Sequence, residues 1–243
     1  MKYCQILLFA FSLLLYSSVQ AIEDNVPTDN EINQTLDVLN HPEDYETTPM
    51  EDVSTSQTTD FNDSVEYTFQ TNNTNAILDL LKEDHSLAFT NIYEGNTISH
   101  ISCGWGNIAI LDYMLTNKLS LLKLNKWKQS VWHKATLSKN TACIIWLLEK
   151  ALTNKELNVL SSKLDSKGNS VIYYHLLNQE ENIDLLTALI ITSKIDLNAI
   201  NKEGFGLIHI AKSLNKQKSI EVLIKHGADS KLKNKNNQTI FDY

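Results

Sequence analysis

A hydroxyl residue followed three places later by histidine recurs along the C-terminal two-thirds of the chain. The positions that begin this pattern are Thr97, Ser130, Ser170, Gly206 (glycine in place of the hydroxyl) and Thr239. They are spaced 33, 40, 36 and 33 residues apart, and histidine follows three residues later at His100, His133 and His209. A period of this length predicts a solenoid, because each short unit can bury its apolar face only against its neighbours.

Between these positions the apolar residues follow a helical period. Ile108, Leu111 and Leu115 fall on one face of a helix, as do Ile220, Leu223 and Ile224. Gly, Asn and Asp separate these short stretches, and strands do not alternate with them. The pattern therefore predicts an all-α fold and argues against a two-layer α/β domain.

The repeats resemble those of the ankyrin repeat family, whose T-P-L-H-x-A motif opens the first of two antiparallel helices. "SVWHKA" matches at Ser130, His133 and Ala135, and "GLIHIA" matches at His209 and Ala211. The resemblance covers 64–243 and implies an ankyrin-repeat solenoid of about five helix-turn-helix units with short β-hairpin-like loops. The expected units are 64–96, 97–129, 130–169, 170–205 and 206–238, followed by a stub at 239–243.

The resemblance also implies which residues are structural. It assigns Thr97, His100, Ser130, His133, Ser170, His209, Gly227 and Thr239 to the motif that ties each helix start to neighbouring backbone. Family members place glycine two residues before the hydroxyl; Gly95, Gly168 and Gly204 comply, whereas Lys128 and Asn237 depart. Tyr173 stands at the histidine position of the third unit, and Trp132 and Trp146 align with core positions.

The N-terminal 63 residues have a different character. Residues 1–21 carry a lysine, an apolar run and a small-residue cleavage pattern, which together predict a secretory signal peptide and a secreted or periplasmic protein. Residues 22–63 are polar and are predicted to be disordered. Residues 22–71 hold 13 acidic residues and no lysine, whereas 72–243 hold 20 lysines against 16 acidic residues. We expect this acidic tail either to fold back on the basic body or to act as a solvated spacer.

Catalysis and metal binding have little support in the sequence. Ser130 and His133 could hydrogen-bond, but a repeated pair suits a lattice, and no G-x-S-x-G, P-loop or G-x-G-x-x-G is present. His100 and Cys103 would form only half of a zinc site. We therefore expect no enzyme activity, no catalytic residue, no cofactor and no metal. Cys103 and Cys143 are expected to be core residues, with a single disulfide between them left open.

Surface recognition remains as the expected function. The net charge of −8 argues against a nucleic-acid partner, and after cleavage of the leader we expect no membrane contact. We expect a monomer that binds a protein through its concave face and loop tips. Trp127 is the most informative candidate, because an exposed tryptophan is a natural interface anchor. The full set of candidate contacts is Tyr93, Ile101, Trp105, Lys126, Trp127, Lys134, Lys167, Tyr174 and Lys202.

Three functions fit these expectations. The first is a secreted, host-directed effector that captures a protein of a target cell. The alternative is a periplasmic accessory or immunity-like protein that blocks a toxic enzyme. A hydrolase or metal enzyme is a remote third possibility.

Overall fold

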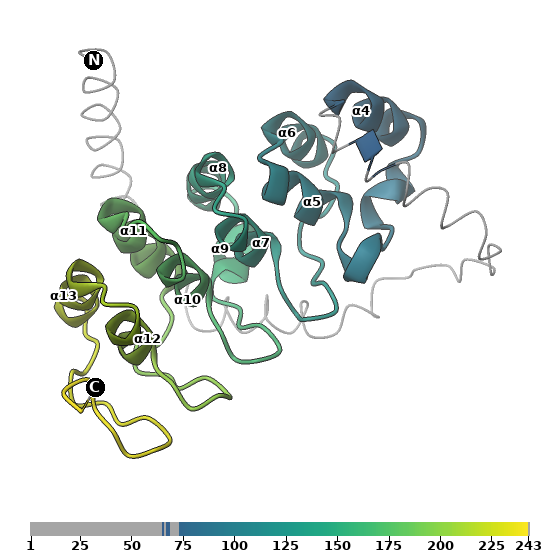
Figure 1. Cartoon of the computed structure of the whole chain (residues 1–243). Helices are drawn as coiled ribbons and strands as arrows, with labels where there is room; N and C mark the ends of the chain where they lie inside the picture. The colour runs from purple at the N-terminus through teal and green to yellow at the C-terminus, as the bar shows by residue number, and fades with distance from the viewer. Residues whose placement is uncertain (1–64, 66, 69–72, 243) are drawn as a thin grey trace, which may run out of the picture.

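The computed structural model describes residues 65, 67–68 and 73–242, so the expected signal peptide and nearly all of the acidic tail lie outside the described residues. Short helices follow one another in pairs (Figure 1). The α-helices are α4 (Thr74–Glu83), α5 (Ile98–Trp105), α6 (Ile108–Thr116), α7 (Val131–Leu137), α8 (Thr141–Ala151), α9 (Lys155–Ser161), α10 (Val171–Leu176), α11 (Ile183–Ser193), α12 (Leu207–Ser213) and α13 (Gln217–Lys225). Two 3₁₀ turns, η2 (His85–Phe89) and η3 (Tyr93–Gly95), follow α4.

The helices form two layers that run in chain order. The first helices of the pairs, α5, α7, α10 and α12, pack side by side in one layer. The second helices, α6, α8, α11 and α13, form the other layer, which α4 extends at its N-terminal end. The all-α prediction is confirmed. The β-hairpin expectation is not supported, because the described part of the chain holds no strand and only one isolated antiparallel bridge, between Ile200 and Gly206.

One continuous apolar core lies between the two layers. Trp132 is fully buried in it and donates its indole N–H to the carbonyl of Leu157 at 2.9 Å. Trp146 is also buried, as its alignment predicts. Leu157 belongs to α9, which packs on α8 and α11 and occupies the longer 130–169 unit. The extra length of this unit is therefore a helix that adds to the core.

The loops between units share one construction. In four of the five loops the residue five places before the hydroxyl position is Asn125, Asp165, Asn201 or Asn234, and its side-chain oxygen accepts backbone N–H groups two and four residues later. The residue two places before the hydroxyl has a positive φ in all five loops, including Lys128 (58°) and Asn237 (64°). The two departures from glycine therefore keep the left-handed turn, at a steric cost that glycine avoids.

The histidines connect one unit to the next. In α5 and α7, the Nδ1 atoms of His100 and His133 contact the capping hydroxyls of Thr97 and Ser130, at 3.0 and 2.9 Å. Their Nε2 atoms reach the carbonyls of Gln129 and Asn169 in the next loop, at 3.0 and 3.3 Å. In α12, His209 Nδ1 accepts the N–H of Gly206, and Nε2 reaches Leu232 and Gln238. The recurring pattern thus orders the helix starts and binds adjacent loops.

Candidate binding surface

Each first helix ends in an exposed apolar side chain. Trp105 is the last residue of α5 and Leu137 the last of α7, while Leu177 and Leu214 cap the ends of α10 and α12. Their exposed fractions are 59%, 43%, 42% and 41%. They lie seven or eight residues after the start of each repeat, and because the four helices pack in order, the exposed helix ends follow one another along the layer.

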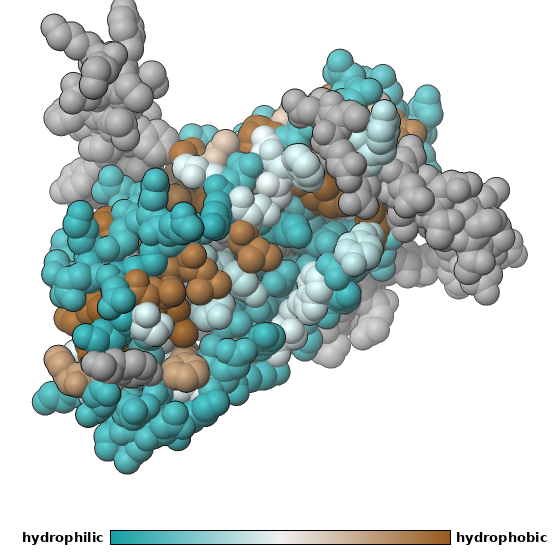
Figure 2. All heavy atoms as spheres, in the orientation of Figure 1, coloured by the Kyte–Doolittle hydropathy of each residue, from teal (hydrophilic) through white to brown (hydrophobic). Residues whose placement is uncertain are grey.

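One helical turn earlier lies a second, half-buried row on the same faces. It consists of Ile101, Lys134, Tyr173 and Ile210, which precede the exposed row by three or four residues. We call the seven apolar residues of the two rows the apolar stripe: Ile101, Trp105, Leu137, Tyr173, Leu177, Ile210 and Leu214. Figure 2 shows apolar residues gathered over α10 and α12, beside an edge of loops that is mostly hydrophilic.

A crevice opens in the stripe between α10 and α12. Tyr173 and Ile210 line it from the two helices, and Leu164, Ile195 and Phe205 line it from the loops. Tyr173 stands where the other first helices carry histidine, and it points to the crevice instead of serving as a loop tie. The loss of histidine at this position therefore accompanies a local hollow in the surface.

Lys134 is the one charged residue within the two rows. Its aliphatic stem lies against α5, since a Cβ added to Gly104 would lie 3.5 Å from Lys134 Cε. Gly104 precedes Trp105, so the stem of Lys134 packs beside the stretch of α5 that ends in Trp105. This placement gives the α5–α7 end of the stripe both an apolar anchor and a positive charge.

The loop tips are joined to one another by backbone hydrogen bonds. Lys126 donates to the carbonyl of Glu94 at 3.2 Å, and Lys202 donates to that of Lys167 at 2.9 Å. Exposed ion pairs add to these bonds: Lys126 contacts Glu94 at 3.1 Å and Lys167 contacts Glu203 at 3.3 Å. The tips therefore present a connected, lysine-rich edge beside the stripe.

Trp127 lies in this edge, but its side chain is half-buried instead of freely exposed. Its carbonyl accepts the N–H of Ser166 at 2.7 Å, and the ammonium of Lys126 lies 4.5 Å from the centre of its ring. The indole is thus held within the tip. Tyr93, at the first tip, is 67% exposed and offers the larger free aromatic surface.

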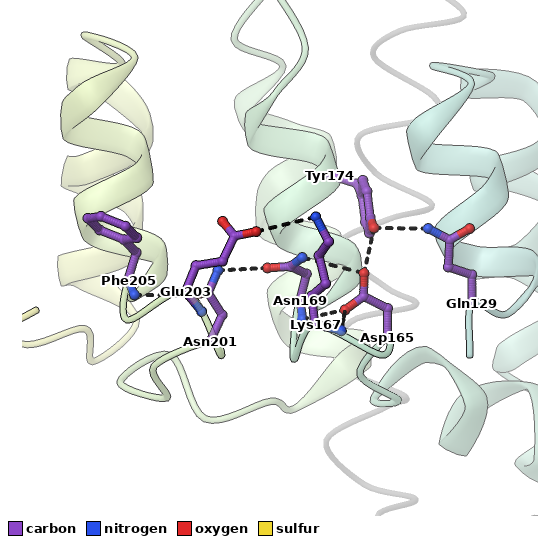
Figure 3. A network of polar contacts seen from close by, with 8 residues as sticks. All are labelled: Gln129, Asp165, Lys167, Asn169, Tyr174, Asn201, Glu203 and Phe205. Carbon is purple, nitrogen blue, oxygen red and sulfur yellow. Dashed lines mark hydrogen bonds and ion pairs between the residues drawn. The ribbon is translucent and has the colours of Figure 1, made fainter. Parts of the chain in front are cut away.

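Tyr174 does not lie on the surface, contrary to the sequence prediction. It is 9% exposed, and Figure 3 shows its hydroxyl between two loops. The hydroxyl donates to Asp165 Oδ2 at 2.6 Å and accepts from Gln129 Nε2 at 2.9 Å. Burial, reinforced by the bond to Asp165, raises the pKa of Tyr174 above its usual value. Tyr173, its half-buried neighbour, takes the surface position.

The Tyr174 contact replaces a direct bond found in two other places. Asn125 Nδ2 donates to Asn96 Oδ1 at 3.0 Å, and Asn201 Nδ2 donates to Asn169 Oδ1 at 2.8 Å. Between the loops of Gln129 and Asp165, the residue in the donor position is Asp165, whose side chain has no N–H to donate. The tyrosine hydroxyl therefore bridges Gln129 and Asp165 where an amide would otherwise connect them.

The histidines of the repeat are engaged in structural bonds. His100 and His133 are fully buried, and desolvation lowers the pKa of each imidazole to about 4, so both are neutral at pH 7. The Ser130–His133 pair caps α7 with both ring nitrogens occupied. Cys103 and Cys143 are buried free thiols. Within the described ranges, no cluster of three or more His, Cys, Asp or Glu is placed to hold a metal ion.

Sequence reasoning missed the exposed leucines of the stripe, Leu137, Leu177 and Leu214. They were detectable, because each lies seven or eight residues after the start of its repeat, as Trp105 does. Ile101 and Trp105 lie in α5 and Lys134 lies in the neighbouring α7, while Lys126, Lys167 and Lys202 lie along the tips. The set is therefore an extended surface instead of a convergent pocket.

No protein-family model and no curated protein matches this sequence. A solved structure does: a chain of the complex described as the Bd0816 predatory endopeptidase from Bdellovibrio bacteriovorus with the immunity protein Bd3460. The likeness has a TM-score of 0.59 at 21% sequence identity, and it covers 73% of this chain and 88% of that chain. None of the helices in residues 73–242 has the length and apolar character needed to cross a membrane. At this identity the likeness concerns the fold alone: the helical stack of this chain has a counterpart in a complex of two proteins.

Proposed function

We propose that this protein is an exported ankyrin-repeat protein that binds and blocks an enzyme, as an immunity protein does, and has no catalytic activity of its own. The observation that carries the proposal is the apolar stripe beside the lysine-rich tips. A row of exposed apolar side chains on four consecutive helices costs solubility and suits a protein interface.

The stripe has the features of an interface between two separately folded proteins. Its centre is apolar, its tip side is charged, and Trp105 offers a large side chain with few rotatable bonds for a partner pocket. The backbone bonds between tips hold the surface in shape before binding, which reduces the ordering entropy that association must overcome. Both features favour stable binding to a folded protein partner.

The inhibitor role is favoured over the effector role by the kind of complex in which the similar fold occurs. That complex joins an endopeptidase to an immunity protein. An extended surface that covers a partner can block an active site without supplying any chemistry. The expected export of the chain would place it where secreted hydrolases pass.

The first experiment identifies the partner and tests inhibition. Immobilised mature chain, beginning at Ile22, is used to capture proteins from the periplasm of the source cells, and the captured protein is identified by mass spectrometry. The purified partner is then assayed with increasing amounts of the mature chain. We expect activity to fall to near zero at one equivalent. A captured enzyme that stays fully active in a stable complex would refute inhibition.

Matched variants test the surface. Trp105→Lys should weaken capture at least about tenfold, which corresponds to about 1.4 kcal/mol of binding free energy. Phe241→Lys is the control, because Phe241 is 72% exposed and lies outside the stripe. Both melting temperatures should stay within a degree or two of the parent. Equal capture by the two variants would remove the stripe from the interface.

One measurement distinguishes the effector function from the inhibitor function. Fractionation of the source cells places an immunity-like inhibitor in the periplasm and a host-directed effector in the culture medium. Recovery mainly from the medium would favour the effector.

A further inference from the structure

Two cysteines from neighbouring units meet in the core. Cys103 belongs to α5 and Cys143 to α8, and both are fully buried free thiols in the structure. We propose that these two thiols form a disulfide that joins the unit 97–129 to the unit 130–169. The proposal goes beyond the inhibitor function, because it concerns a bond within the chain whatever partner the surface binds.

The chain segments that carry the two cysteines approach closely. α8 packs on α5, and Asn140 at the start of α8 places its Nδ2 atom 3.5 Å from the carbonyl oxygen of Gly104, the residue after Cys103. The same side chain fills the space beside Gly106, where an added Cβ would lie between 2.4 and 2.8 Å from it. Asn140 Oδ1 also accepts the backbone N–H of Cys143 at 3.1 Å. One side chain therefore holds the start of α8 against the end of α5.

The two thiols are in contact with each other. The Cys103 thiol hydrogen-bonds with that of Cys143, and this contact adds to burial in raising the pKa of Cys103. A disulfide draws the sulfur atoms to about 2 Å and calls for Cα atoms about 4.4–6.8 Å apart. Thiols that already touch across two packed helices approach this geometry by rotation about χ1. Because Cys4 lies in the predicted leader, no third thiol of the mature chain competes for either partner.

The bond forms by thiol–disulfide exchange with a small-molecule or protein disulfide, of which oxidised glutathione is an example. One cysteine thiolate attacks the oxidant and releases one glutathione thiol, and the second thiolate attacks the cysteine sulfur of the mixed disulfide and releases the other. Two protons and two electrons thus pass from the protein to glutathione. Since the folded core buries both thiols, exchange takes place before the units pack. The predicted export would bring the chain to a compartment where such oxidants act.

The bond would fix one end of the candidate binding surface. α7 packs on both α5 and α8, and the exposed Trp105 and Leu137 end α5 and α7. Thirty-nine residues lie between Cys103 and Cys143. Closing a loop of this length restricts the unfolded chain and should raise the urea midpoint by about 1–2 M.

The test refolds the whole mature chain, beginning at Ile22, from urea in a buffer of oxidised and reduced glutathione. The product is denatured, treated with N-ethylmaleimide and examined by mass spectrometry. We expect a monomer without adducts that is lighter than the reduced chain by two hydrogen atoms. Its urea midpoint should lie about 1–2 M above that of the reduced chain.

The matched control moves one thiol to the neighbouring residue. Ala142→Cys combined with Cys143→Ala keeps the loop almost unchanged in length but places the thiol at an exposed position, about 100° around the helix. Its midpoint in the glutathione buffer should not exceed that of its reduced form. Cys143→Ala alone should have the same midpoint in both buffers.

Several results would overturn the proposal. The parent could keep two thiols that react with N-ethylmaleimide, carry glutathione on either cysteine, or form disulfides between chains. A bond that forms but leaves the midpoint unchanged or lower would show that the folded core does not accommodate it. An equal rise in the control would assign the effect to loop closure by any pair of thiols. No partner enzyme is present in this experiment, so its failure leaves the inhibitor function standing, and failure of inhibition leaves the disulfide standing.

Discussion

Replacing Tyr174 with phenylalanine should weaken the junction between the second and third complete helix pairs. The change removes one hydroxyl and leaves Gln129 Nε2 and Asp165 Oδ2 without their shared partner. Both residues are 6% exposed, so water does not readily replace the lost bonds. Asp165 Oδ2 then keeps only the 3.4 Å bond from Asn169 Nδ2. Depriving the buried amide and the carboxylate of the hydroxyl costs about 2–4 kcal/mol. With a urea m-value of about 2 kcal/mol/M, the unfolding midpoint should fall by about 1–2 M.

A second substitution tests the reason for this loss. Asp165→Asn in the Tyr174→Phe background provides an N–H that can reach Gln129 Oε1, as Asn125 reaches Asn96. It should restore about 1 kcal/mol, and the double-mutant cycle should give a coupling of about 1 kcal/mol or more. Tyr173→Phe is the control and should change stability by less than about 0.5 kcal/mol. If Tyr174→Phe costs no more than this control, or if Asp165→Asn destabilises the double variant further, the bridging role is wrong.

Three further predictions concern buried groups and backbone geometry. His100 and His133 have folded-state pKa values of about 4, below the unfolded value of 6.5, so their stabilising effect is complete above pH 6.5 and is lost as the pH falls towards 4. The unfolding free energies from urea titrations at pH 7.5 and 5.0 should differ by about 2 kcal/mol per histidine. The His133→Gln variant should show a smaller difference, and pH profiles identical to the parent's would contradict this assignment. Lys128 has a φ of 58°, a left-handed conformation that glycine adopts at lower cost. Lys128→Gly should therefore raise the unfolding free energy by about 0.5–1 kcal/mol. A decrease in the melting temperature would count against strain at this turn. Cys103 and Cys143 are both buried, and burial raises the pKa of the Cys103 thiol well above its usual value. Neither cysteine of the reduced mature chain should therefore react with a thiol reagent at pH 8 until the protein unfolds. Rapid labelling of the folded chain would show the site to be open.

The repeat pattern predicted the helical fold well, because helix starts depend on local chemistry. A hydroxyl, a histidine three residues later and an apolar period of 3.6 are properties of short segments, and the structure forms a helix at each of them. The position of Tyr174 was not predictable in this way. Its burial depends on Asp165 standing where Asn125 and Asn201 stand in other loops, and on a glutamine in the preceding loop. Side-chain compensation across a unit boundary is invisible to a pattern read one unit at a time.

The candidate surface shows the same division between local and non-local information. Trp105 was identified because tryptophan is rare and conspicuous, whereas Leu137, Leu177 and Leu214 resemble ordinary core leucines in sequence. All three lie at the C-terminal ends of their first helices and are exposed there. Exposure is decided by the packing of the next element, which composition does not specify.

The Tyr174 bridge also determines how firmly two neighbouring units of this molecule stay together under stress. In a stack of units that contact only their neighbours, the junction with the weakest interface opens first. The junction spanned by Tyr174 lacks the direct amide bond, and His133 reaches Asn169 there at 3.3 Å, compared with 3.0 Å for His100 and Gln129. Without the Tyr174 hydroxyl this junction would therefore open more readily, and a protease would reach the chain there sooner. A bound protein that contacts the units on both sides of this junction would hold them together and protect the whole chain from cleavage.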